Sequence, residues 1–456
     1  MMSAGLIAST ERRMVLGLGA TGCSVARWWR RQGIPFIAVD TRAELSQSAA
    51  VREAIGPDTE LFAGDIDSSL LSSVSELVVS PGIAMDHPWV VQALESGARV
   101  IGDIDLFVAA ARAPVLGITG SNGKSTVTGM LGAMIAGCGK RVAVGGNFGT
   151  PALDLLDDDV EFYVLELSSF QLERAEPLSL AVATVLNVSP DHLDRHGSLQ
   201  RYHFAKHRIF RGAKAVVANR ADPLTIPLLE EAADVVLWRP TDPDLQEFGV
   251  RVVNGESVIC RGFEPLIPVA ELPLPLPGHH NVANTLAALA MGAAAGLPID
   301  GLLDGLRQFR GLPHRCELVA DCDGVRWIND SKATNIGAAT AALRGLGVGQ
   351  NILLIAGGVG KGQDFSSFAA PVREHCKRVL TLGEAARDIE HALGGTTPVQ
   401  RVATLEAALQ RAQQLAVPGD IVLLSPACAS FDMFSSYEAR GAAFRAGVTE
   451  LLGEAA

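Results

Sequence analysis

The chain has 456 residues, of which 48% are hydrophobic and 19% are charged, and its formal net charge is −12. This length exceeds what a single hydrophobic core ordinarily serves, so we expect two or three domains. The acidic balance repels phosphate backbones and argues against a nucleic-acid partner. The seven cysteines are scattered without C-x-x-C spacing, which argues against a disulfide framework and against a structural zinc site.

Two apolar segments are too short to be targeting or membrane elements. The N-terminal stretch 1–14 has too short an apolar run for a signal peptide. The Ala-rich stretch from Val282 to Leu297 contains Asn284 and ends at Pro298, so it is too short and too polar to span a bilayer. We therefore expect a soluble, cytoplasmic protein with no membrane partner, and we expect it to be a monomer.

The first hundred residues alternate between short apolar runs and helical patterns. The pattern predicts strands at 14–18, 36–40 and 76–80, and helices at 24–33, 49–55 and 88–96. Strands that alternate with helices predict a parallel, doubly wound sheet, here a Rossmann-like domain over residues 1–102.

Two further α/β series follow. Strands are predicted at 113–120, 141–146, 161–167, 181–187 and 215–220, and then at 325–331, 351–358, 378–383 and 420–426. Between these series, 242–277 is rich in proline and short strand-like pieces, and a long Ala-rich helix follows it. We expect a central P-loop-type ATPase domain with a mostly parallel sheet over 103–312 and a Rossmann-like domain over 313–456, joined by a hinge at 309–315.

The first glycine-rich loop has a nucleotide-binding pattern. Gly17, Gly19 and Gly22 form G-x-G-x-x-G between a predicted strand and helix, and Asp40 ends the next strand. This pattern directs a helix N-terminus toward phosphate and an acid toward a ribose hydroxyl. It does not identify the nucleotide, since NAD, FAD and a UDP-sugar all fit, and the alternative is that the glycines only permit close strand-to-helix packing.

The second glycine-rich loop, residues 117–126, reads GITGSNGKST. A strict P-loop has glycine where this chain has Ile118, but the chemistry is supplied. Backbone amides can hold phosphates at the helix N-terminus, Lys124 can reach the β and γ oxygens, and Ser125 or Thr126 can hold Mg²⁺. The pattern strongly favours ATP binding over an ordinary turn with a surface lysine.

Acidic and imidazole groups follow two of the later strands. Glu166 ends one predicted strand, and Asp191, His192 and Asp194 come just after another. Ligands of open α/β sheets gather beyond the carboxyl ends of the strands, so these groups and the phosphate loop predict a Mg²⁺ site. Taken singly, Glu166 could be a solvated carboxylate and His192 a capping histidine. Lys206 would ordinarily belong to a basic helix face.

Seven motifs in order along the chain resemble those of the Mur ligase family. They are TGSNGKST (119–126), ELSSFQLE (166–173), NVSPDHLDRH (187–196), GHHNVAN (278–284), LPHRCE (312–317), WINDSKATN (327–335) and SPACASFDMF (425–434). The resemblance extends through all three expected domains, and it is closest to the branch of the family that adds D-glutamate.

The resemblance implies a ligase of peptidoglycan synthesis, and with it roles in cell wall biogenesis, cell shape and cell division. Such an enzyme uses ATP and one or two Mg²⁺ ions to join glutamate to a UDP-linked muramoyl-alanine, through an acyl phosphate and a tetrahedral intermediate. Only the resemblance indicates the D form of glutamate, since a carboxylate clamp does not distinguish mirror images.

The resemblance also implies roles for individual residues. The UDP-substrate would be bound by Thr21, Asp40, Arg42 and Asn147. ATP would be bound by Gly120, Ser121, Asn122, Gly123, Lys124, Ser125, Thr126, Val127, Asn281, Arg315 and Asp330. Glutamate would be bound by Lys332, Thr334, Lys361, Ser430 and Phe431. The metal would be held by Ser125, Glu166, His192 and a carbamylated Lys206, and Lys124, Glu166, His192 and Lys206 would form the catalytic set. Val359 and Phe431 depart from the family pattern on the glutamate side.

Three alternatives remain open at this point. An NAD-dependent oxidoreductase would explain the first glycine-rich loop but would leave Lys124 and Glu166 unused. A folylpolyglutamate synthase would share the ATP loop, although the first domain favours a uridine nucleotide. A non-catalytic UDP-sugar sensor would not need intact Lys124 and metal ligands.

Overall fold

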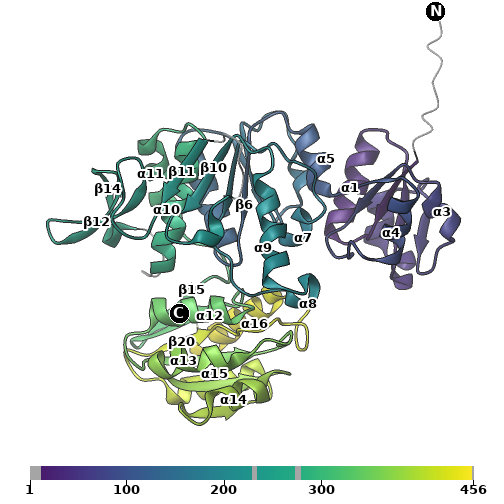
Figure 1. Cartoon of the computed structure of the whole chain (residues 1–456). Coiled ribbons are helices and arrows are strands. Elements are labelled where there is room, and N and C mark those ends of the chain that lie inside the picture. Colours follow the sequence, from purple (N-terminus) through teal and green to yellow (C-terminus); the bar gives the residue numbers. More distant parts are fainter. Residues whose placement is uncertain (1–11, 228–233, 273–278, 454–456) are drawn as a thin grey trace, which may run out of the picture.

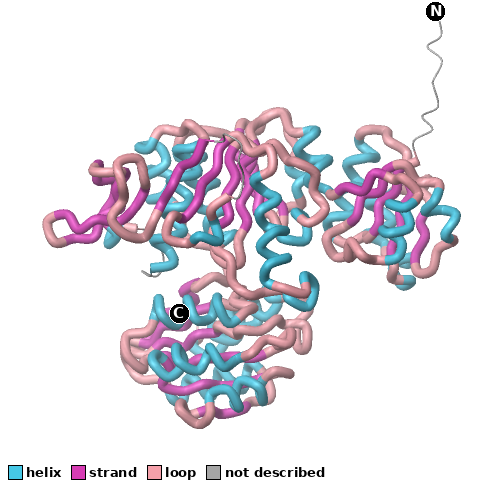
Figure 2. The backbone as a smooth tube through the Cα atoms, in the orientation of Figure 1, coloured by secondary structure: helices cyan, strands magenta, loops and turns pink. Residues whose placement is uncertain are grey.

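The computed structural model describes residues 12–227, 234–272 and 279–453. The N-terminal residues 1–11 and Gly278 of the GHHNVAN motif lie outside this part. The described strands form three sheets, each in a separate part of the molecule (Figure 1). Helices flank the strands in each part (Figure 2), so the expected α/β class with mostly parallel sheets is confirmed.

The first sheet has the order β3-β2-β1-β4-β5 and is parallel throughout. Its strands are β1 (Arg13–Leu16), β2 (Ile37–Asp40), β3 (Leu61–Ala63), β4 (Glu76–Val79) and β5 (Arg99–Ile101). The helices are α1 (Ala20–Arg31), α2 (Ala49–Ile55), α3 (Ser68–Ser72) and α4 (Pro88–Glu95). The next helix, α5 (Asp103–Ala110), lies beside the second sheet (Figure 1). The strand order is that of a Rossmann sheet (3-2-1-4-5-6) without its sixth strand, and it places the glycine-rich loop at the carboxyl end of the central strand β1.

Gly22 in the first glycine-rich loop has a packing role. A Cβ atom there would lie 1.8 Å from the Gly17 carbonyl oxygen, so only glycine lets α1 approach the turn that follows β1. The packing alternative considered for this loop is therefore correct for Gly22, and it does not conflict with nucleotide binding.

The second sheet has the order β14-β13-β12-β11-β10-β9-β6-β8-β7. Its strands are β6 (Val115–Thr119), β7 (Val142–Gly146), β8 (Phe162–Glu166), β9 (Val182–Val185), β10 (Ala215–Asn219), β11 (Asp234–Trp238), β12 (Phe248–Val253), β13 (Glu256–Arg261) and β14 (Glu264–Pro268). The helices are α6 (Lys124–Gly137), α7 (Ser169–Leu172), α8 (Leu193–His196), α9 (Leu199–His207), α10 (His279–Ala294) and α11 (Ile299–Gln308). Strands β12 to β14 pair antiparallel, which explains why the sequence changes character after residue 242.

The third sheet has the order β15-β16-β20-β17-β18-β19, with only the β15–β16 pair antiparallel. Its strands are β15 (Glu317–Cys322), β16 (Val325–Asn329), β17 (Ile352–Gly357), β18 (Cys376–Leu382), β19 (Val399–Arg401) and β20 (Ile421–Leu424). The helices are α12 (Ile336–Leu346), α13 (Ala369–His375), α14 (Ala386–Leu393), α15 (Leu405–Leu415) and α16 (Tyr437–Leu452). Strands β17 and β20 are buried along their whole length, as expected for a sheet covered on both faces.

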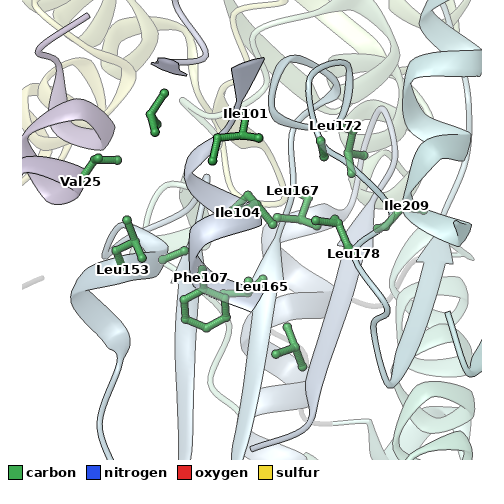
Figure 3. Close-up of a cluster of buried hydrophobic side chains, with 14 of the residues drawn as sticks. Val25, Ile101, Ile104, Phe107, Leu153, Leu165, Leu167, Leu172, Leu178 and Ile209 are labelled. Atoms are coloured by element: carbon green, nitrogen blue, oxygen red, sulfur yellow. The ribbon is translucent and has the colours of Figure 1, made fainter. Parts of the chain in front are cut away.

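A continuous hydrophobic cluster joins the first part to the second. It extends from Val25 on α1 through Phe107 on α5 to Leu165 on β8 (Figure 3). The rings of Phe107 and Tyr163 meet edge to face with centroids 5.0 Å apart. This shared core opposes independent movement of the two parts.

Arg174 strengthens this junction with hydrogen bonds. Its fully buried guanidinium donates to the carbonyl oxygens of Val79 (2.9 Å), Ser80 (2.5 Å) and Ile83 (3.0 Å), all in the segment after β4. Because these acceptors belong to the first part and Arg174 to the second, this side chain fixes the segment after β4 against the middle of the molecule.

All seven cysteines are free, as the spacing predicted. Within the ranges that the structure describes, no helix combines the length and the apolar character needed to cross a lipid bilayer.

Candidate active site

The second glycine-rich loop connects β6 to the first turn of α6. Gly123 has φ +82°, a left-handed conformation that favours glycine, and Lys124 begins the helix. The Lys124 amine donates to the carbonyl oxygens of Gly120 (2.9 Å) and Ser121 (3.0 Å). Desolvation lowers the pKa of Lys124, and the charge of Glu166 partly opposes this. A helix N-terminus next to a lysine amine is suited to bind a phosphate anion.

Glu166 ends β8 directly beside this loop and is 1% exposed. One carboxylate oxygen accepts from the Ser125 hydroxyl, and the other accepts from Asn147 Nδ2 at 2.8 Å. Burial by itself would raise the pKa of Glu166, but the charges of Lys124 and Arg315 outweigh it and hold the pKa below its usual range. The ionised carboxylate is therefore maintained in a buried, polar position.

Arg315 reaches this group from the other side of the site. It lies before β15, at the beginning of the third part, and its guanidinium donates to Ser125 Oγ at 2.6 Å. The contact brings together a lysine, an arginine, a hydroxyl and a carboxylate at one helix end. Such a set can neutralise charge that develops on phosphoryl oxygens.

Lys206 lies beneath the phosphate loop. Its side chain is 1% exposed, and its amine donates to the Gly120 carbonyl at 2.8 Å and lies 4.4 Å from the centre of the Tyr202 ring. The alternative of a solvated basic helix face is therefore wrong for this residue. Desolvation, with the nearby charge of Lys124, lowers the pKa of Lys206 well below its ordinary value.

His192 and Asp191 follow β9 at the same edge of the sheet. His192 has φ +52°, its side chain is 35% exposed, and its ring meets Phe170 edge to face at 4.9 Å. Desolvation lowers the pKa of His192, while Asp191, 3.7 Å from its Nε2 atom, opposes this. A neutral imidazole is the form that binds metals.

One cavity of about 430 Å³ contains most of these groups. Its lining comes from both the second and the third sheets. Among the residues singled out in the sequence, it includes Ser121, Asn122, Gly123, Lys124, Thr126, Asn147, Glu166, His192, Asn281, Arg315, Asp330, Lys332 and Thr334. Val127 differs, because its side chain packs in the hydrophobic core behind the loop.

Asp330 lies where β16 ends and lines the cavity from the third part. It accepts hydrogen bonds from Ser425 Oγ (2.8 Å) and the Cys316 amide (3.2 Å). Burial raises the pKa of Asp330 to about 6.

Of the residues expected to bind glutamate, some line this cavity and others lie on neighbouring loops. Lys332 lines the cavity with its amine 3.6 Å from the centre of the Tyr437 ring, and desolvation lowers its pKa to about 8. Lys361, Ser430 and Phe431 do not line this cavity. They lie on two loops of the third part that are joined by a bridge between Val359 and Ala429. Val359, one of the two departures from the family pattern, thus contributes its backbone to this bridge.

The residues expected to bind the UDP-substrate lie at two places. Thr21 is in the first turn of α1, and Asn147 lies in the cavity beside Glu166. Asp40 is 1% exposed, and its oxygens accept from the Leu18 amide at 2.6 Å and from Arg42 Nε and Nη2 at 3.0 Å each. Asp40 therefore orders the glycine-rich loop and orients Arg42, whose side chain is half exposed.

Asn335 is a residue of the cavity that sequence reasoning missed. Its Nδ2 atom donates across the cavity to Asp191 (3.2 Å) and to Asn122 (3.3 Å), while its Oδ1 caps α12 by accepting from Ala338 N at 2.8 Å. Only the capping role has a sequence signal, an asparagine before a helical pattern.

Family models match all three parts of the chain. A model described as Mur ligase MurD-like, N-terminal domain matches residues 11–102, the Mur ligase middle domain matches 118–292, and the Mur ligase glutamate ligase domain matches 314–428. The chain belongs to the Mur ligase family.

Several relatives within that family share one name. The UDP-N-acetylmuramoylalanine–D-glutamate ligase of Pseudomonas syringae pv. tomato is 52% identical over 441 residues, which cover 96% of this chain and 98% of the relative. The ligases of that name from Pseudomonas aeruginosa and Nitrosococcus oceani are 51% and 46% identical, and the alignments cover 98% and 96% of this chain and 99% and 96% of the relatives.

Solved structures support the fold. UDP-N-acetylmuramate-alanine ligase MurC from Thermotoga maritima aligns over 96% of this chain and 99% of its own with a TM-score of 0.62 and 17% identity. A pseudomurein peptide ligase type C from Methanothermus fervidus covers 97% of this chain and 100% of its own, with a TM-score of 0.61 and 19% identity.

Proposed function

We propose that this chain is an ATP-dependent ligase that adds D-glutamate to UDP-N-acetylmuramoyl-L-alanine in peptidoglycan precursor synthesis. The observation that carries the proposal is the convergence of Lys124, Arg315 and Glu166 at the start of α6, in a chain about half identical to D-glutamate ligases over nearly their whole length. Membership of the Mur ligase family removes the oxidoreductase alternative, and the named relatives favour this activity over folate glutamylation.

In this proposal the three parts are three domains with different ligands. Residues 1–102 bind the UDP group through Thr21 and Arg42, residues 103–312 bind ATP, and residues 313–456 bind glutamate and part of the nucleotide. The half-exposed Arg42 side chain, held by the buried Asp40, supports a contact with an anionic or polar group of the UDP-substrate.

ATP phosphates lie on the loop at 120–126 in this proposal. The amides at the N-terminus of α6 and the amine of Lys124 bind them, Asp330 contacts the ribose, and Asn281 is a further ATP contact; both residues line the cavity. Arg315 reaches the phosphates from the third domain. These assignments are supported by the cavity lining, which joins residues of both domains.

The residues present fit Mg²⁺, because hard cations take oxygen ligands and Glu166 supplies a buried carboxylate beside the Ser125 hydroxyl. Ser125, Glu166, His192 and a carbamylated Lys206 would hold it. Among the residues that the structure describes, no group of three His, Cys, Asp or Glu side chains is placed to hold a metal ion. When bound, the ion supplies positive charge to phosphoryl oxygens.

Carbamylation of Lys206 is supported by the state of its amine. A neutral amine attacks carbon dioxide and loses a proton, which gives an anionic carbamate. Burial lowers the pKa of Lys206 well below its ordinary value, which favours the neutral amine that this reaction needs. The carbamate would change a buried cation into an oxygen ligand next to the phosphate loop.

Activation of the acceptor is the central chemical problem. A free carboxylate is a poor electrophile, so its oxygen first attacks the γ-phosphorus of ATP, which gives an acyl phosphate and ADP. Lys124 and Arg315 neutralise the charge that develops on the transferred group. The amine of glutamate then attacks the carbonyl carbon, and the tetrahedral intermediate expels inorganic phosphate.

The third domain would orient the incoming amino acid. Lys332 and Thr334 line the cavity, and Lys361, Ser430 and Phe431 lie on the neighbouring loops. A lysine paired with the side-chain carboxylate would direct the amine toward the acyl phosphate and reject neutral amino acids. The substrates supply the chemistry, and the enzyme supplies orientation and charge.

Closure would assemble a site built from separate domains. Gly311, at φ +80° in the segment between α11 and β15, is the proposed hinge. Small-angle scattering checks this, because the profile should become more compact when an ATP analogue and the UDP-substrate are added together. Identical profiles with and without these ligands would argue against closure.

The proposed activity is tested by incubating the protein with ATP, Mg²⁺, UDP-N-acetylmuramoyl-L-alanine and either D- or L-glutamate. Phosphate release and a product mass raised by one glutamate residue are expected with the D form only. Lys124→Ala should remove this activity, and Lys140→Ala, which changes an exposed lysine paired with Glu161, should retain it. We expect the reaction to take place in the cytoplasm, where ATP is available.

A further inference from the structure

Arg440 is a buried arginine on α16 that the proposed chemistry does not use. It is 3% exposed, and its guanidinium donates only to uncharged oxygen atoms. The acceptors are Ser331 Oγ (3.0 Å) and the carbonyl oxygens of Ser331 (2.9 Å), Cys428 (3.1 Å), Ala429 (3.4 Å) and Gly357 (3.5 Å). Within the described part of the chain, no carboxylate forms an ion pair with it.

These acceptors lie at the carboxyl ends of β16, β17 and β20, in or next to the three loops that follow these strands. Ser331 directly precedes Lys332, and Gly357 is the last residue of β17, before the turn that leads to Lys361. Cys428 and Ala429 directly precede Ser430. Each loop therefore carries a residue that the proposed function assigns to glutamate, and Arg440 contacts each loop one to four residues away from it.

Other hydrogen bonds also join these loops: Ser425 Oγ donates to Asp330 at 2.8 Å, and Gln363 Nε2 donates to the Ala427 carbonyl at 3.3 Å. Val359 and Ala429 exchange two backbone hydrogen bonds, at 2.9 Å and 3.0 Å, and this bridge joins the second loop to the third. The first loop is tied to α16 by the Ser331 hydroxyl, which donates to the Tyr437 carbonyl at 2.8 Å. Gln363 also accepts from the Ile336 amide at 3.2 Å, just after the first loop, but it belongs to the second loop itself. Arg440 contacts all three loops from outside them, through one guanidinium on α16.

Burying a guanidinium without a paired carboxylate costs desolvation free energy that no ion pair offsets. Desolvation lowers the pKa of Arg440 to about 10, so the group stays charged at neutral pH. An apolar side chain would fill the same space more favourably. The planar fork of donors is the property that an apolar side chain, or lysine, cannot reproduce.

We propose that Arg440 is a positioning residue that holds Lys332, Lys361 and Ser430 in one amino-acid pocket. The inference rests on the proposed function, since it takes the glutamate assignments from it. Arg440 does not touch substrate in this proposal. It fixes the relative positions of three loops, so that the two carboxylates of glutamate find their partners without reorganisation.

The test separates formation of the acyl phosphate from attack by glutamate. Hydroxylamine, a small amine, attacks an acyl phosphate to give a hydroxamate and phosphate, and it does not need a glutamate pocket. For Arg440→Lys we expect the Michaelis constant for D-glutamate to rise by roughly tenfold or more, and those for ATP and the UDP-substrate to change less than about threefold. Hydroxylamine-dependent phosphate release should stay near that of the unmodified enzyme.

Arg445→Lys is the matched control, because it makes the same substitution five residues further along α16, at a half-exposed arginine that pairs with Glu317. Its Michaelis constants should not change. Ser331→Ala removes one acceptor of Arg440 and should raise the Michaelis constant for D-glutamate by a smaller factor. This variant keeps the proposal testable if Arg440→Lys does not fold, as judged by its thermal melting curve.

Three outcomes overturn the proposal. If Arg440→Lys and Ser331→Ala both keep the normal Michaelis constant for D-glutamate, the loops do not need Arg440. If Arg440→Lys is fully active and Arg440→Met is inactive, the positive charge is required and the planar set of guanidinium donors is not. Equal loss of glutamate- and hydroxylamine-dependent release in a folded Arg440→Lys variant means that the whole site is disturbed. Absence of phosphate release from the unmodified enzyme with either amine would instead contradict the proposed function.

Discussion

The guanidinium of Arg315 donates to the hydroxyl of Ser125 at 2.6 Å, and Ser125 donates in turn to Glu166. Ser125 and Glu166 belong to the second part of the chain and Arg315 to the third. The phosphate loop thus receives a second positive charge only when these two parts are in contact.

Arg315→Ala should lower the turnover number by about 10²- to 10³-fold, because it removes one fixed charge from the transferring phosphoryl group. Steady-state phosphate release measures the change. Arg310→Ala is a suitable control, since Arg310 lies in the same connecting segment but is exposed and donates to the Arg307 carbonyl. Comparable losses in both variants would mean that the segment, and not the charge, is responsible.

Lys361→Ala should raise the Michaelis constant for glutamate far more than that for ATP, because a lysine on the loop after β17 is assigned to the side-chain carboxylate. Initial rates at varied glutamate and at varied ATP give both constants. Lys377→Ala, which breaks an ion pair with Asp420 on the same domain, provides the comparison. Equal increases for both substrates in Lys361→Ala would contradict the assignment.

Lys206 should carry a carbamate in solutions that contain bicarbonate. With ¹³C-labelled bicarbonate, the protein is expected to show a carbamate carbon signal that disappears in Lys206→Arg, because an arginine cannot be deprotonated in proteins. The signal should persist in Lys214→Ala, which changes an exposed lysine. A signal that survives Lys206→Arg would exclude Lys206 as its source.

Asp103 should make the protein less stable as the pH rises. Burial raises its pKa from 3.8 to about 6, and its Oδ1 atom has no hydrogen-bond partner. A carboxyl group whose pKa is higher in the folded state stabilises that state below the unfolded pKa, and this contribution is lost as the pH rises through the folded pKa. The shift corresponds to about 3 kcal/mol of unfolding free energy.

Asp103→Asn removes this titration and retains an acceptor for Gln171, whose Nε2 atom donates to Asp103 at 3.2 Å. In denaturant unfolding at a series of pH values, the free energy of unfolding of the variant should rise relative to that of the unmodified protein from pH 4 to pH 7. A difference between the two proteins that does not vary with pH would show that Asp103 titrates normally. Asp67→Asn, at an exposed helix cap, controls for general charge effects.

The fold could be predicted because its buried parallel strands appear in the sequence as continuous apolar runs, as in β17 and β20. Strands β3, β5 and β19 were harder to recognise, since each has only three residues. The antiparallel strand β15 lies at the edge of the third sheet, and its residues are mostly half-buried or exposed, so it lacks a strong apolar run.

The site could be predicted where a residue follows a strand or a glycine-rich loop, which holds for Lys124, Glu166 and His192. Asn335 and Arg440 could not be found in this way, because their partners lie far away in the sequence: Asn335 contacts Asn122, and Arg440 contacts Ser331. Local patterns carry no information on such contacts. For Asp40 the pattern predicts a ribose contact, which stays a prediction, and the structure adds hydrogen bonds from the Leu18 amide and from Arg42 that the pattern does not reveal.

The hydrogen bonds of Arg174 and the hydrophobic cluster around Phe107 hold the first part against the second, so we expect movement only at the interface between the second and third parts. In the proposed function, the surface that would bind the UDP group is then in place before the substrate binds. An inhibitor search should therefore treat that surface as fixed and test several separations of the second and third parts, which meet where Arg315 and Asn335 contact the phosphate loop. A compound that binds between these two parts and separates them would move both side chains away from the phosphate loop.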